Sequence, residues 1–91
     1  MINQHLVKLA EDIERLVDKF EDPNGKIKTN YGIVVNLITY AIYGYIASET
    51  PAKCNWVVIN EAVSVLIASH NTNYPIQPKI TAIVIDVLNR G

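Results

Sequence analysis

The sequence predicts an all-α fold of four helices paired into two hairpins, and three observations support this class. Apolar residues recur at helical spacing through the first twenty positions. Proline-containing or turn-forming segments then divide the remainder into three apolar stretches of helical length. The 91 residues, 49% of them hydrophobic, suffice for only one domain. We therefore expect a single domain over 1–91, built as a small antiparallel four-helix bundle that is oligomeric.

The first helix is expected over residues 2–21. Its apolar residues alternate at spacings of three and four, and charged residues occupy the remaining positions, as in an amphipathic helix. Glu11 and Arg15 lie one turn apart, and we interpret this charged face as solvated. The segment has neither a basic leader nor an unbroken apolar core, so we expect a cytoplasmic protein without a signal peptide. The apolar stripe consists of Ile2, Leu6, Leu9, Ile13, Leu16 and Phe20.

Residues 22–25, Asp-Pro-Asn-Gly, are expected to form a turn that ends the first helix. The same tetrapeptide suits a β-hairpin with 26–28 as its second strand, which is the weaker alternative. The second helix, expected over 30–48, carries no charge for eighteen residues and is just long enough to span a membrane. Asn36 and Thr39 argue against a span, because lipid offers them no partners. An apolar helix in water must be enclosed, and a chain this small needs other subunits to enclose it.

The third helix is expected over 51–70, because Thr50 followed by Pro51 is typical of an N-cap with proline at the first helical position. Its polar residues, which we expect to face water, are Asn60, Glu61 and Ser64.

The fourth helix is expected over 78–89, where Gln77 and Pro78 repeat the same pattern. The β-branched residues of 80–87 favour a strand and leave open an α+β fold with a C-terminal strand. The apolar residues of the segment fall on one helical face, however, and this spacing favours a helix.

Composition and motifs exclude several classes of function. The net charge is −1, and residues 29–91 hold only six charged side chains, so nucleic acid is disfavoured as a partner. No phosphate loop, zinc signature or nucleophile motif is present in the sequence. The best improvised catalytic set is Cys54, Glu61 and His70, and a lone cysteine is more often a small buried residue. We expect neither catalysis nor a bound metal or cofactor.

Five tyrosines against one phenylalanine are the distinctive feature of the composition. Buried tyrosines need partners for their hydroxyls, so they gather where an apolar surface meets water, ligand or protein. Asn36, Tyr40 and Tyr43 share a face of the second helix, and His70 and Tyr74 bound a polar loop. We take these five as candidate partner- or ligand-binding residues. The alternative is that the tyrosines and the amide pair with one another inside a dimer core.

Three functions are consistent with these features. The leading hypothesis is a non-catalytic, oligomeric helical protein that binds another protein, of the inhibitor, immunity or adaptor type. The second is an oligomer that holds a small aromatic or nucleotide-like ligand between subunits. The third is a small membrane-associated protein with residues 31–48 as its span.

Overall fold

The computed structural model describes residues 4–20, 31–70 and 75–90, and all regular structure in those ranges is helical. The elements are α1 (Gln4–Asp18), α2 (Tyr31–Glu49), the short 3-10 turn η1 (Pro51–Lys53), α3 (Trp56–Ala68) and α4 (Gln77–Asn89). The predicted all-α class is confirmed. The alternative of a C-terminal strand is wrong, because that segment forms α4. The alternative hairpin at 22–28 lies outside the described residues.

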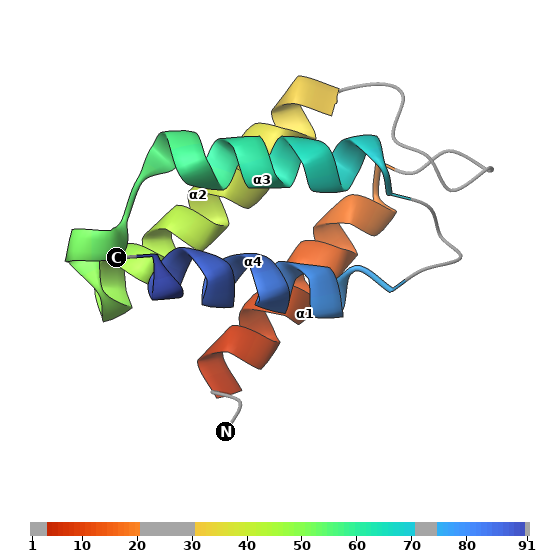
Figure 1. Ribbon diagram of the computed structural model, residues 1–91. Coiled ribbons are helices and arrows are strands. Elements are labelled where there is room, and N and C mark those ends of the chain that lie inside the picture. Colours follow the sequence, from red (N-terminus) through yellow and green to blue (C-terminus); the bar gives the residue numbers. More distant parts are fainter. Residues whose placement is uncertain (1–3, 21–30, 71–74, 91) are drawn as a thin grey trace.

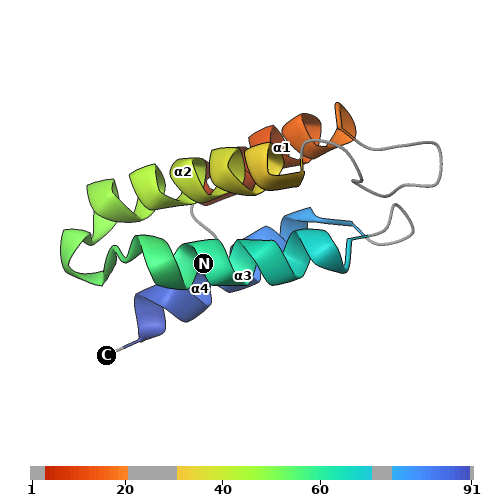
Figure 2. The same cartoon turned by 90° about the horizontal axis from the view of Figure 1, so that it is seen from above.

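The four helices lie in two layers (Figures 1 and 2). α1 and α2 form one layer, and α3 and α4 form the other. α2 packs mainly on α3, and α1 packs mainly on α4. A single apolar core lies between the layers and receives residues from all four helices, including Ile13, Val17, Val34, Ile38, Ile42, Ile59, Val63, Ile80 and Val84.

The β-branched stretch of α4 is helical because its apolar residues share one face. Ile80, Val84 and Val87 are buried, and they follow one another at spacings of four and three. Burial of this face outweighs the modest preference of isoleucine and valine for strands, which is worth a few tenths of a kcal/mol per residue.

α3 begins at Trp56, five residues later than predicted, because Asn55 and not Thr50 is its N-cap. The backbone of Asn55 is extended (φ −137°, ψ 110°), and its Oδ1 accepts hydrogen bonds from the backbone N–H groups of Val57 (3.0 Å) and Val58 (3.3 Å). The Thr50 side chain makes no capping bond; Pro51 instead starts η1. The prediction that α3 starts at residue 51 was wrong.

Two further expectations about the polar residues were also wrong. Gln77 was expected to cap the fourth helix, but α4 begins at Gln77 itself. The residue before it is the buried Ile76, whose side chain cannot cap a helix. Of the polar strip predicted to face water on α3, Glu61 is exposed as predicted, but Asn60 and Ser64 are half-buried and turned toward α2. The carbonyl of Ser64 accepts a hydrogen bond from the Tyr31 hydroxyl (2.7 Å). Val57 and Val65 take the solvent-facing positions instead.

Candidate functional site

The helix predicted to be fully enclosed has a broad exposed apolar face. Ile33, Leu37 and Tyr40 follow one another at helical spacing on α2, and they are 56%, 45% and 72% exposed. The opposite face of α2, which carries Val34, Ile38 and Ile42 among others, is the one that enters the core. One chain therefore buries only part of this helix, which carries no charge before Glu49.

Trp56 extends the exposed face across to α3. Its ring lies edge-on to that of Tyr40, with centroids 6.4 Å apart and planes inclined at 73°. A second contact, to Tyr43, has a centroid distance of 5.8 Å and an inclination of 60°. Both geometries are favourable for aromatic pairs. Trp56 holds this place because it is the first residue of α3, directly after the Asn55 cap.

Five of the exposed side chains line one shallow, open groove of about 620 Å³, and this shared groove makes the surface contiguous. Scattered apolar residues are normal on protein surfaces, whereas a contiguous patch marks an interaction site. We call this surface the α2 face. It comprises the groove residues Ile33, Asn36, Leu37, Tyr40 and Trp56, together with Tyr43, which packs on Trp56.

Polar contacts fix the α2 face to α3. Thr39 is fully buried, and its hydroxyl donates to the carbonyl of Val35 (2.7 Å) while accepting from Nδ2 of Asn60 (3.2 Å). The same Asn60 nitrogen lies 3.4 Å from Oδ1 of Asn36. Asn36 therefore has a partner on the neighbouring helix of its own chain, and its side chain is exposed. The buried Thr39 was not predicted as a site residue.

The remaining predicted site residues do not join the α2 face. His70 is buried, at 6% exposed, just beyond the opposite end of α3. Fourteen residues separate it from Trp56, which corresponds to roughly 20 Å along a helix. Tyr74 lies outside the described residues.

The improvised catalytic set is not assembled either. Cys54 lies within the predicted third helix but precedes α3 in the structure, so it shares no helical face with Glu61. Its thiol donates to the carbonyl of Tyr43 (3.3 Å). Glu61 is exposed, and His70 is at the far end of the helix. Among residues 4–20, 31–70 and 75–90, no group of three or more histidine, cysteine or acidic side chains is placed to hold a metal ion.

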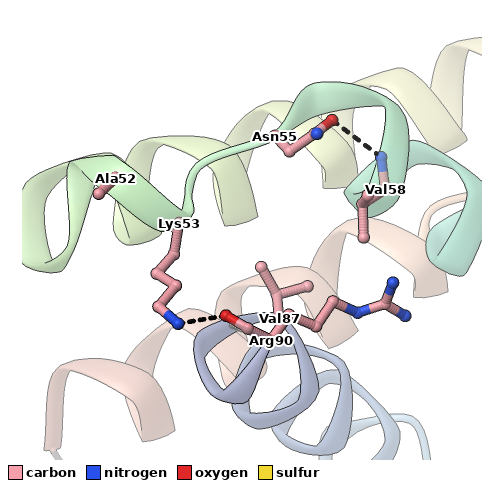
Figure 3. Close-up of a pocket in the computed structure, with 6 residues that line it drawn as sticks. All are labelled: Ala52, Lys53, Asn55, Val58, Val87 and Arg90. Carbon is pink, nitrogen blue, oxygen red and sulfur yellow. Dashed lines mark hydrogen bonds between the residues drawn. The ribbon is translucent and has the colours of Figure 1, made fainter.

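A second, smaller pocket of about 260 Å³ lies where η1 meets the end of α4 (Figure 3). Two cationic side chains line it, and both have partners within the chain. The Lys53 ammonium donates to the carbonyl of Arg90, and the Arg90 guanidinium pairs with Asp86 (2.9 Å). This pocket therefore joins η1 to the C-terminal end of α4, and its charges are already engaged.

Over the part of the chain that the structure describes, the fold and the site together define a small helical protein with an exposed aromatic face. Comparisons with protein-family models, with curated proteins and with solved structures give no match to this chain. Asn36, Tyr40 and Tyr43 were named from the sequence as candidate binding residues, whereas Trp56, which lies on the same surface, was not. The available signal was the single tryptophan of the chain, placed directly after an asparagine that can cap a helix.

Proposed function

We propose that this protein is a non-catalytic, cytoplasmic binding protein that recognises another polypeptide through the α2 face. In this proposal the chain acts as an antiparallel four-helix bundle that associates with other subunits, in the manner of inhibitors, immunity proteins or adaptors.

The observation that carries the proposal is the contiguous aromatic and aliphatic surface around Tyr40 and Trp56. Tyrosine and tryptophan dominate binding energy at protein interfaces, because each buries a large area while ordering few rotatable bonds. Tyr40 is 72% exposed, so its ring contributes little to the core of its own chain. The cap on α3 and the Asn60 contacts to α2 hold these rings in place before binding, which lowers the entropic cost of association.

Photo-crosslinking tests this proposal directly. Tyr40 would be replaced by p-benzoylphenylalanine in the full chain, expressed in the cells that make it, and Ile85 on α4 would be replaced likewise as the matched control. Ile85 is 48% exposed and lies in the other helical layer. We expect irradiation to give a polypeptide adduct from position 40 and not from position 85. No polypeptide adduct from position 40, or equal adducts from both positions, would overturn the proposal.

A small aromatic or nucleotide-like ligand held between subunits is the second candidate function. It is favoured by the juxtaposition of two aromatic rings with the amide of Asn36 along one groove. The groove is open, whereas ligand sites usually enclose most of their ligand, so a second subunit would have to close it. A compound that co-purifies with the protein and raises its melting temperature would favour this function.

The third candidate, a membrane-associated protein, depends on the length and composition of α2. Over an 18-residue window this helix has a mean hydropathy of 1.3, and 33% of the window is buried inside the chain. Core helices of soluble proteins can have the same length and hydropathy. Recovery of the chain only in the presence of detergent would favour this function over the other two.

A further inference from the structure

We propose that the occupant of the α2 face is a second copy of this chain, which binds through the same face to form a symmetric dimer. This inference rests on the proposed function, because it names the polypeptide that the face recognises.

The size of the face is the first argument. The exposed parts of its six side chains amount to on the order of 600 Å² per chain, given the areas that large side chains present. A stable interface buries about 800 Å² on each partner, including its polar rim. Two α2 faces placed against each other therefore approach the area of a stable dimer. The same area left in water would lie at the upper end of the apolar patches that soluble monomers expose.

The chemistry of the face is the second argument. In a dimer with twofold symmetry the same patch meets itself, so a charged side chain near the axis faces its own copy. The α2 face carries no charged residue, and α2 has none before Glu49. A partner of a different kind is commonly selected by complementary charges, which this face does not offer. Two copies of the α2 face can therefore meet without bringing like charges together.

Asn36 supplies a polar group that can pair with its own copy. A carboxamide both donates and accepts, which is why single asparagines can specify register in helix dimers. Within the described part of the chain, the carbonyl oxygen of Asn36 is near Asn60, and its NH₂ group donates no hydrogen bond. Space is also open on the same side of α2: a Cβ built on Gly44, one turn after Tyr40, would have no heavy atom within 4 Å apart from the adjoining backbone of its own helix.

The test is the mass of the purified full chain, measured by sedimentation velocity from high to low micromolar concentration. We expect twice the chain mass of 10.2 kDa at about 10 μM and above, as micromolar or tighter affinity is typical of interfaces of this area. Tyr40→Glu should weaken dimerisation at least tenfold, whereas Ile85→Glu, an equally charged change on α4, should not alter it. A monomeric wild-type chain, or equal effects of the two variants, would overturn the inference.

A charge-swap experiment keeps the result independent of folding defects. Tyr40→Glu and Tyr40→Lys, each weakened in self-association when alone, should associate more tightly with each other when combined, because their charges attract across the interface. Helical circular dichroism verifies that each variant is folded. Variants that fold but give no mixed dimer would contradict the symmetric interface. The crosslinking experiment separates the two proposals. An adduct whose mass differs from that of two chains would refute the dimer but not the binding function. The absence of any adduct would refute the binding function.

Discussion

Tyr40 and Trp56, sixteen residues apart in the chain, meet edge-to-face at the surface with ring centroids 6.4 Å apart. The contact joins the outward side of α2 to the first turn of α3. It gives two partly exposed rings a fixed relative position, and a fixed pair of rings is a better binding anchor than either ring alone.

Truncation of Tyr40 tests whether this anchor functions in binding. We expect Tyr40→Ala to weaken association by about 2 kcal/mol or more, because exposed aromatic anchors dominate interface energies. The free energy of unfolding of the isolated chain should change by only about 0.5 kcal/mol, since the side chain is 72% exposed. Glu14→Ala on α1 is the control and should alter association by only tenths of a kcal/mol. Urea unfolding at low concentration and sedimentation at high concentration separate the two quantities. A variant that unfolds readily but still associates normally would show that Tyr40 is a core residue.

Asn36 and Asn60 should respond differently to the loss of their amides. We expect Asn36→Leu to leave the free energy of unfolding within about 0.5 kcal/mol, because Asn36 is exposed and Asn60 retains its bond to Thr39. Its oligomeric state or partner specificity should change, as with register-setting asparagines. Asn60→Leu should cost about 1 kcal/mol or more, since Thr39 is fully buried and loses a partner. If Asn36→Leu leaves both assembly and binding unchanged, Asn36 has no place in the site.

The N-cap of α3 gives a prediction that distinguishes the structure from the sequence pattern. Asn55→Ala should lower the free energy of unfolding by about 1 kcal/mol, because it removes the acceptor for two backbone N–H groups. Thr50→Ala is the matched control and should have a smaller effect, as the Thr50 side chain makes no cap bond. Chemical denaturation of both variants measures the difference. A larger effect at Thr50 would mean that α3 starts at Pro51 after all.

Tyr45 should make the protein less stable in alkaline solution. Burial, and secondarily the negative charge of Glu49, raise the pKa of the Tyr45 hydroxyl above its usual value of 10.0. The folded chain therefore retains a proton that the unfolded chain releases, so this stabilisation is complete below about pH 10 and is lost as the pH rises through the folded-state pKa. Tyr45→Phe should lessen the decline in melting temperature between pH 9 and pH 11. An identical decline in the variant would assign the alkaline sensitivity to other groups.

The helical class could be predicted from the sequence because each core stripe repeats every three or four residues, as in Ile80, Val84 and Val87. The start of α3 could not be predicted from the sequence, because Thr50-Pro51 and Asn55 are both acceptable helix starts. Asn55 is selected as the start by the packing of α3 against α2 and α4. The prediction that Asn60 faces water was wrong for a related reason. The sequence of α3 does not distinguish a solvated amide from a half-buried one, because the partner of Asn60, the buried Thr39 hydroxyl, lies on α2.

The candidate site was predictable only in part. Helical spacing alone places Asn36 and Tyr40 on neighbouring positions of α2, and in the structure both are exposed rather than enclosed. The contribution of Trp56 depends on how α3 lies across α2, which no local pattern contains. The distance between this surface and His70 is also a consequence of the tertiary arrangement, because His70 closes the other end of α3.

Trp56 is the single tryptophan of the chain, so its fluorescence reports on the α2 face alone. The most direct test of the account is the quenching of this fluorescence by acrylamide as the protein is concentrated from low to high micromolar. Because Trp56 is 39% exposed in one chain, we predict that quenching falls severalfold, with a blue-shifted emission, over the concentration range in which the mass doubles. Quenching that stays constant while the mass doubles, or a mass that never rises, would contradict the α2 face as the surface through which this protein binds its own copy.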